Sequence, residues 1–177
     1  MEEKIPPPVV EAARNGDAGA LAQICERLYP RIYRYVSYKV DDLRDAEDLA
    51  GEVFVRMLGA IQGQKGNLEA WLFRIAGNVL MDHYRKRAVR SGEVELPEEI
   101  AGGIDPEAAV ERKLDGDRLR KGLQALTEEQ RETVILRLVM GYEHDEVAAI
   151  MGRSTGAIRA LQFRALAALR DALEKRL

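Results

Sequence analysis

The sequence has few of the residues on which disulfide, metal-binding or membrane-spanning structure depends. Its 177 residues include one cysteine, Cys25, which excludes an internal disulfide and a cysteine-rich zinc site. The two histidines, His83 and His144, are too few and too far apart for an ordinary metal centre. No apolar run approaches the roughly 18 residues of a membrane-spanning helix, and the charged, proline-rich N-terminus lacks the apolar core of a signal peptide. We therefore expect a soluble, cytoplasmic protein with no cofactor, no metal and no stable membrane insertion.

Signals for β structure are also scarce, whereas helical spacing of apolar residues is widespread. Such spacing predicts helices over 21–36, where Pro30 indicates a kink or a new start, over 45–61 and over 67–87. The segment 91–105 is rich in glycine and glutamate without periodicity, which predicts a linker. The fold class is therefore all-α.

Helical spacing returns after Pro106, so we expect two helical domains, over 9–90 and 106–177. The sequence Thr127-Glu128-Glu129-Gln130 predicts a capping box that opens a helix. The apolar face of that helix is expected to contain Val134, Ile135, Leu138 and Val139.

The net charge of −3 conceals a strong sorting of charge along the chain. The segment 41–58 has six acids against two bases, and 91–117 has nine acids against two bases. By contrast, 71–90 has five bases against one acid, and 153–170 has four arginines and no acid. This alternation suits a protein that binds both a polyanion and a second protein, although solvated helix faces would explain it equally well.

The strongest local pattern is EVAAIMGRSTGAIR at 146–159, which has the spacing of a helix-turn-helix. Small alanines allow the two helices to approach, Gly152 suits the left-handed turn, and Ser154 can cap the second helix. The start of that helix would then face a DNA major groove. The alternative is an ordinary helical hairpin with a polar outer face.

Two motifs in the N-terminal half, DAEDLAGEVF at 45–54 and AWLFRIAGNVLMDHYRK at 70–86, sharpen the interpretation. Together with the helix-turn-helix, they resemble the extracytoplasmic-function group of bacterial RNA polymerase sigma factors, which keeps the second and fourth conserved regions of sigma. The resemblance covers 9–90 and 106–173. It implies a non-catalytic subunit that binds core RNA polymerase and directs promoter recognition, DNA melting and transcription initiation at a specific regulon.

The resemblance implies that the acidic helix docks on the coiled coil of the largest polymerase subunit. Asp48 and Glu52 are spaced to lie on its solvent side, where they could pair with basic residues. Gly51 departs from the family, in which a polar residue, often glutamine, is usual. The expected core-polymerase-binding residues are Asp45, Asp48, Leu49, Glu52 and Arg56.

The helix over 71–87 corresponds to the segment that captures the melted minus-ten promoter element. Arg74, Asn78 and Arg85 are spaced to share one face, and the loop over 62–67 corresponds to the place where related factors hold a flipped base. Trp71 is more readily explained as a core residue than as a stacking platform. The residues expected to bind the minus-ten element are Gln64, Lys65, Asn67, Arg74, Asn78, Arg85, Lys86 and Arg87.

The C-terminal helix-turn-helix would read the minus-thirty-five element and meet the flap of the second-largest subunit. The residues expected to bind this DNA are Arg153, Ser154, Thr155, Arg159 and Gln162. The resemblance also implies an anti-sigma factor as a partner. The linker glutamates, Glu93, Glu95, Glu98 and Glu99, fit either a nucleic-acid mimic inside polymerase or a solvated tether.

Two other classes of function compete with this one. A stand-alone helix-turn-helix regulator would need neither the acidic helix nor the basic face of 71–87. A hydrolase or metal enzyme has only His144-Asp145-Glu146 and Asp82-His83 in its favour, without a nucleophile elbow or a phosphate-binding loop.

Overall fold

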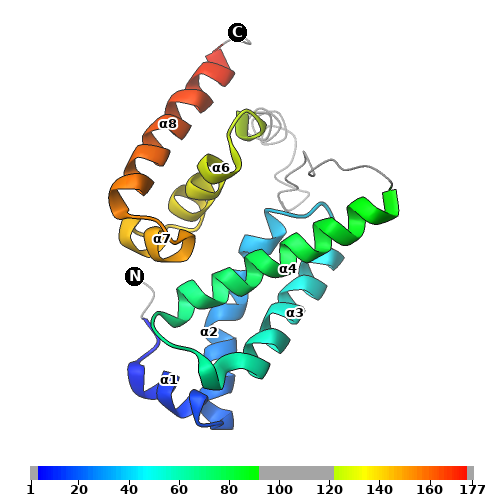
Figure 1. The fold of residues 1–177 in the computed structure, drawn as a ribbon, viewed down its shortest axis with the longest axis vertical. Coiled ribbons are helices and arrows are strands. Elements are labelled where there is room, and N and C mark those ends of the chain that lie inside the picture. Colours follow the sequence, from blue (N-terminus) through cyan, green and yellow to red (C-terminus); the bar gives the residue numbers. More distant parts are fainter. Residues whose placement is uncertain (1–3, 92–121, 175–177) are drawn as a thin grey trace, which may run out of the picture.

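The computed structural model describes residues 4–91 and 122–174, and every regular element within those residues is a helix. The N-terminal half contains α1 (Pro7–Arg14), α2 (Ala18–Ser37), α3 (Leu43–Ala60), the 3-10 turn η1 (Ile61–Gly63) and α4 (Leu68–Ser91). The C-terminal half contains α6 (Glu128–Val134), the π-helical η3 (Ile135–Val139), α7 (His144–Met151) and α8 (Thr155–Glu174). Figure 1 shows α2 and α3 on one side of α4, and α6 to α8 on the other. The predicted all-helical architecture is confirmed, whereas the predicted linker lies outside the described residues beyond Ser91.

The helix α2 is a single element that buries one continuous apolar stripe. Asp17 caps its start by accepting a hydrogen bond from the Ala20 amide at 2.7 Å. The buried positions recur every three or four residues, as in Ala20, Ile24, Leu28, Ile32, Tyr35 and Val36. Pro30 is exposed, so water can hydrate the carbonyl that it leaves without a donor, and the helix continues without a new start.

The helix α4 is buried on two sides because it lies between the domains. It packs against α2 and α3 and, on its other side, against α7. Asn67 caps its first turn by accepting a hydrogen bond from the Ala70 amide at 2.8 Å. Its buried residues therefore extend around the helix and include Leu72, Phe73, Ala76, Val79 and Leu80.

The capping box predicted at Thr127 is confirmed, but the apolar register after it is not. The Gln130 amide donates to Thr127 Oγ1 at 3.3 Å, and the Thr127 amide donates to Gln130 Oε1 at 3.0 Å. In η3 the Met140 amide then donates to the Ile135 carbonyl, five residues earlier, at 2.9 Å. This wider turn shifts the face, so Leu136 is buried and Leu138 is 53% exposed. The prediction that Leu138 faces the core is wrong.

The helices α7 and α8 form the predicted helix-turn-helix. Gly152 ends α7 with φ +63°, the left-handed conformation that glycine adopts without strain. Ser154 caps α8 by accepting a hydrogen bond from the Ala157 amide at 3.2 Å. Val147 and Ile158 are fully buried between the two helices, which fixes their crossing.

A single apolar cluster extends through both halves of the protein. It includes Val53 and Leu72 of the N-terminal half together with Ile135, Val147 and Ile158 of the C-terminal half. Nowhere in residues 4–91 and 122–174 is there a helix of the length and apolarity needed to cross a membrane.

Candidate functional site

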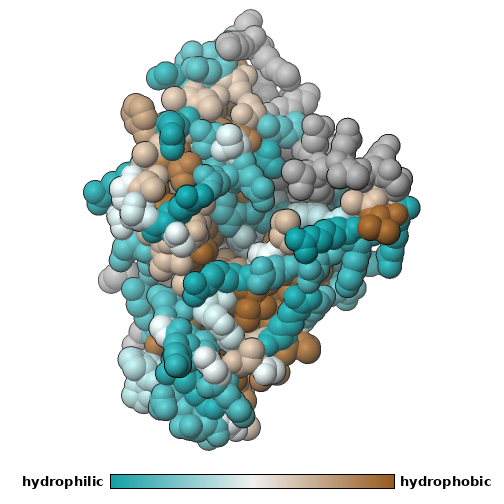
Figure 2. All heavy atoms as spheres, in the orientation of Figure 1, coloured by the Kyte–Doolittle hydropathy of each residue, from teal (hydrophilic) through white to brown (hydrophobic). Residues whose placement is uncertain are grey.

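The acidic face of α3 lies on the surface of the N-terminal domain. Asp48 is exposed, and Glu52 is half-buried within an i,i+4 ion pair with Arg56. Arg56 also donates to Asp82 Oδ2 of α4 at 2.9 Å, which joins the acidic helix to the basic one. These hydrogen bonds, first that to Asp82, raise the pKa of Arg56. Figure 2 shows hydrophilic residues following α4 across this view of the molecule.

Two other residues expected to bind polymerase, Leu49 and Asp45, are less exposed than Asp48. Leu49 is only 7% exposed and belongs to the apolar core, because it lies on the inner side of α3. Asp45 is half-buried with its carboxylate 3.9 Å from His83 Nε2. Among the expected carboxylates, Asp48 is exposed, whereas the side chains of Asp45 and Glu52 are 44% and 39% exposed.

The same helix exposes two apolar residues that sequence reasoning missed. Val55 is 69% exposed and Leu58 is 49% exposed, one and two turns beyond Gly51. A Cβ atom built at Gly51 would meet nothing within 4 Å, so a side chain there would extend over the same surface. Their apolar character on the solvent side was the available signal, since positions in register with Val53 and Met57 fill the core.

The outer face of α4 presents most of the predicted basic residues. Arg74, Asn78, Arg85 and Lys86 are exposed. Arg85 lies 3.8 Å from Asp82, an exposed pair that costs little to separate. Arg87 forms an ion pair with Asp41 at 3.1 Å, which links the end of α4 to the start of α3.

The loop before α4 is built around a buried glutamine. Gln64 is 3% exposed and accepts hydrogen bonds from Arg14 Nε at 3.1 Å and Nη2 at 2.6 Å. Its amide nitrogen donates to the carbonyls of Lys65 and Gly66, both at 3.0 Å. Gln64 is thus engaged in shaping the loop, contrary to the expectation of a base contact, and Asn67 caps α4. Lys65 is exposed at the loop tip.

The helix-turn-helix brings the predicted minus-thirty-five residues to one end of the C-terminal domain. Arg153, Ser154 and Arg159 are exposed and Thr155 is half-buried. Arg153 forms an ion pair with Glu129 of α6. Gln162 is turned toward its own domain, with Oε1 2.8 Å from His144 Nε2 and 3.4 Å from Arg137 Nε.

Two exposed residues of α8 extend the outer surface of the recognition helix. Phe163 is 76% exposed, one turn beyond Arg159, and Arg164 beside it is also exposed. Sequence reasoning missed Phe163, although its position outside the register of the buried Ile158, Leu161 and Ala165 was an available signal.

A groove of about 750 Å³ lies between α4 and the C-terminal half of the chain. Arg74 and Asn78 of α4 line one wall, and Arg153 at the start of the recognition turn lines the opposite wall. Tyr84 and Glu132 also face this space. The residues expected to hold two separate promoter elements therefore open onto one groove.

Three tyrosines, the buried Tyr35 and Tyr142 and the half-buried Tyr84, have raised pKa values. Burial raises the pKa of Tyr84 to about 12, and its hydroxyl donates to the Lys39 carbonyl. Burial, together with nearby Glu132, raises the pKa of Tyr35 well above its usual value. Burial and the hydrogen bond to Glu69 raise the pKa of Tyr142. Burial also raises the pKa of the half-buried Cys25 thiol, as expected for a structural cysteine.

Comparison with known families matches both halves of the chain. Residues 24–90 match the family described as Sigma-70 region 2, and residues 122–171 match the family described as Sigma-70, region 4. Across residues 4–91 and 122–174, no group of three or more His, Cys, Asp or Glu residues could hold a metal ion.

Curated relatives extend the similarity over nearly the whole chain. It is 34% identical to the ECF RNA polymerase sigma factor BldN of Streptomyces coelicolor, over 91% of this chain and 63% of that one. It is 33% identical to the ECF RNA polymerase sigma factor ShbA of Streptomyces griseus, over 94% of each. It is also 33% identical to the ECF RNA polymerase sigma factor SigD of Mycobacterium tuberculosis, over 92% of this chain and 81% of that one.

Two solved structures share the fold. CnrH in complex with the cytosolic domain of CnrY matches 97% of this chain and 99% of its own, with a TM-score of 0.72 and 22% identity. The sigma factor RpoE of Bartonella quintana, in complex with the anti-sigma factor NepR, matches 86% and 96%, with a TM-score of 0.66 and 24% identity. Both helical domains are therefore a recurrent architecture.

Proposed function

We propose a division of labour between the two domains of this chain, which belongs to the extracytoplasmic-function (ECF) group of RNA polymerase sigma factors. The protein is a non-catalytic subunit that directs RNA polymerase to promoters. This membership removes the stand-alone regulator and the hydrolase from consideration. In the proposed division, each exposed surface has a partner of its own.

The surface of α3 docks on the coiled coil of the largest polymerase subunit. The observation that carries this assignment is the combination of exposed Asp48 and half-buried Glu52 with exposed Val55 and Leu58 on one helix. An apolar centre rimmed by charge is typical of a specific protein interface. The carboxylates would set the orientation against basic residues of the coiled coil, and the apolar pair would supply the buried area.

A charge reversal tests this assignment directly. We expect Asp48→Lys to weaken binding to purified core polymerase at least tenfold, measured by fluorescence anisotropy of the labelled chain. Glu11→Lys is the matched control, because Glu11 is an exposed acid on α1, away from α3. Equal affinity of the two variants would refute the α3 assignment, provided that both melt like the wild-type protein.

The exposed face of α4 holds the melted minus-ten element. Arg74 and Arg85 can contact phosphates, while Asn78 offers both a donor and an acceptor to a base edge. Lys65 at the loop tip and Lys86 extend the positive surface. Asn78→Ala should reduce permanganate reactivity of unpaired thymines in the open complex, whereas closed-complex formation should be unchanged.

The recognition helix α8 reads the minus-thirty-five element. The exposed Arg153 and Ser154 would contact phosphates, and the exposed Arg159 would contact base edges. Phe163 can contact a thymine methyl group one turn along the helix.

The same domain would meet the flap of the second-largest subunit. Arg159→Ala should lower transcription from the promoter without lowering affinity for core polymerase.

One further partner and a role for the linker follow from the family rather than from the described residues. An anti-sigma factor would cover the docking surfaces in the cytoplasm and hold the protein inactive. The glutamates of the linker, which lie outside the described residues, would mimic nucleic-acid charge inside polymerase. Replacing all four by glutamine should change the ratio of abortive to full-length transcripts while core binding persists.

A further inference from the structure

The loop before α4 is held in place by a side chain from α1, the first helix of the chain. The helix α1 ends at Arg14, before residue 24, where the match to Sigma-70 region 2 begins. Arg14 donates to Gln64 Oε1 from Nε at 3.1 Å and from Nη2 at 2.6 Å, across fifty residues of sequence. The loop is therefore tied to a helix that lies outside the matched segment.

Gln64 carries this contact into the loop backbone. Its amide nitrogen donates to the carbonyls of Lys65 and Gly66, both at 3.0 Å. The opposite orientation of the amide would place its NH2 group against the guanidinium and its oxygen against two carbonyls, so the network fixes the amide in one way. One side chain thus links Arg14 to the two exposed residues at the tip of the loop.

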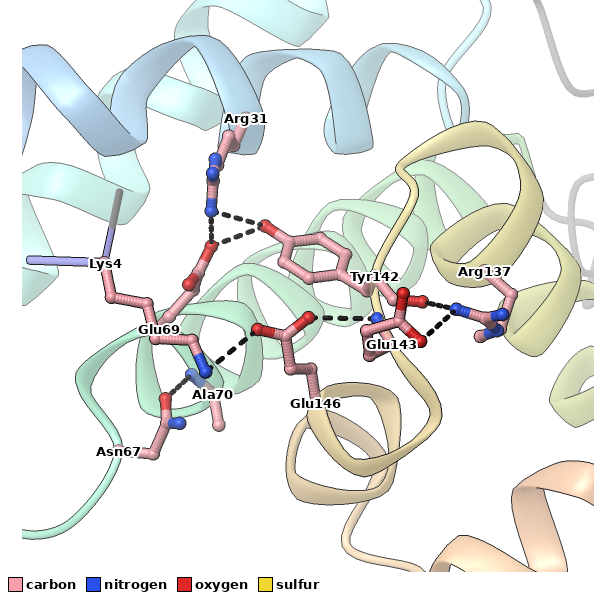
Figure 3. A network of polar contacts seen from close by, with 9 residues as sticks. All are labelled: Lys4, Arg31, Asn67, Glu69, Ala70, Arg137, Tyr142, Glu143 and Glu146. Carbon is pink, nitrogen blue, oxygen red and sulfur yellow. Dashed lines mark hydrogen bonds and ion pairs between the residues drawn. The ribbon is translucent and has the colours of Figure 1, made fainter. Parts of the chain in front are cut away.

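Gln64 is the central anchor of the loop. Ile61 and Leu68 are buried at its two ends, with exposures of 3% and 7%. Within 62–67, a stretch that the structure describes throughout, Gln64 is the one buried residue. Asn67 is exposed and accepts a hydrogen bond from the Ala70 amide at the start of α4 (Figure 3). Loss of the Arg14 contact would therefore release the middle of the loop while both ends stay packed.

The loop leads directly into the helix assigned to the minus-ten element. Asn78, on the exposed face of α4, lies eleven residues beyond Asn67, which is about 16 Å along the helix. The loop tip at Lys65 and the side chain of Asn78 would therefore meet different nucleotides of the melted strand. A loop that is already ordered binds more tightly, because less conformational entropy is lost on binding.

We propose that Arg14 is a positioning residue, which acts through Gln64 to hold the loop so that it selects bases at one end of the minus-ten element. The proposal rests on the proposed function, because it assumes that α4 and its preceding loop bind this element. Arg14 itself would not touch DNA. A purely structural role would lower transcription from every promoter alike, whereas a positioning role alters preference only at the bases that meet the loop.

Two variants break the contact on different sides of Gln64. Arg14→Met removes the donors but keeps a long side chain. Gln64→Glu still accepts from Arg14, but it sets a second oxygen against the carbonyls of Lys65 and Gly66, so only the loop side is lost. Glu11→Gln is the matched control. It removes the charge from the exposed Arg14–Glu11 pair at 3.2 Å and leaves the Gln64 contact in place.

The assay measures base preference along the minus-ten element. Transcription by wild-type holoenzyme first selects a promoter from a randomised DNA library, and templates with single-base changes are then transcribed by each variant holoenzyme. Arg14→Met and Gln64→Glu should reduce preference about tenfold at the bases nearest the start of α4, the worth of one hydrogen bond to a charged group. Asn78→Ala should reduce preference at other bases. Arg14→Lys, which keeps one donor group, should give an intermediate loss.

Affinity for core polymerase should match the wild type in both variants, because α3 is unchanged. An equal loss of transcription on all templates, a wild-type pattern of preference, or a loss at the bases affected by Asn78→Ala would overturn the proposal, as would the same loss in Glu11→Gln. Gln64→Glu keeps the result informative if Arg14→Met fails to fold. If wild-type holoenzyme selects no promoter from the library, the proposed function fails instead.

Discussion

A glycine within the docking helix offers a sharp test of how α3 works. Gly51 lies in the middle of α3, is half-buried, and has nothing within 4 Å of a built Cβ atom. Glycine within a helix costs up to about 1 kcal/mol relative to alanine, and glutamine is nearly as favourable as alanine. Gly51→Ala should therefore raise the melting temperature by about 2–4 °C in a chain of this size.

Core polymerase binding separates the stabilising effect from the docking effect. Gly51→Gln adds a polar group beside Asp48 and should tighten binding about 2- to 10-fold, the worth of one hydrogen bond, whereas Gly51→Ala should not. Gly77→Ala is the control. A Cβ atom at Gly77 would also meet nothing within 4 Å, but Gly77 belongs to α4 and not to the docking helix α3. A lower melting temperature for Gly51→Ala, or equal polymerase affinity for all three variants, would refute the reasoning.

Four other variants test the packing and electrostatics of the two domains. Ile158→Ala removes a fully buried side chain from the helix-turn-helix and should cost about 2–5 kcal/mol of unfolding free energy in urea titration. Gln64→Ala leaves the Arg14 guanidinium and two loop carbonyls without their buried partner, so it should lower the free energy of unfolding by about 1–3 kcal/mol. Lys65→Ala should leave stability unchanged and impair only promoter opening. The raised pKa of Tyr84, about 12, predicts that stability falls as pH rises from about 10 to 12, since the unfolded chain loses this proton first; Tyr84→Phe should flatten that fall.

Features decided by neighbouring residues were predictable from the sequence. The capping box at Thr127 and the left-handed turn at Gly152 depend on a few adjacent side chains, and both form as expected. The exposed basic residues of α4 likewise follow from helical spacing alone.

Features decided by distant contacts were not predictable in this way. Gln64 is buried because Arg14, fifty residues earlier, supplies its partner. Leu138 faces solvent because the π-helical turn in η3 shifts the register of its helix. Tyr142 is buried with its hydroxyl bonded to Arg31 and Glu69 of the N-terminal half, so no local pattern marks it.

Competition for core RNA polymerase tests the central claim most directly. Purified core enzyme should bind this chain with one-to-one stoichiometry, and excess primary sigma factor should displace it, because both would occupy the same coiled coil. The Asp48→Lys variant should be displaced from core polymerase at a lower concentration of primary sigma factor than the wild-type chain. Simultaneous binding of both proteins, or no binding by a chain that melts cooperatively, would contradict the account.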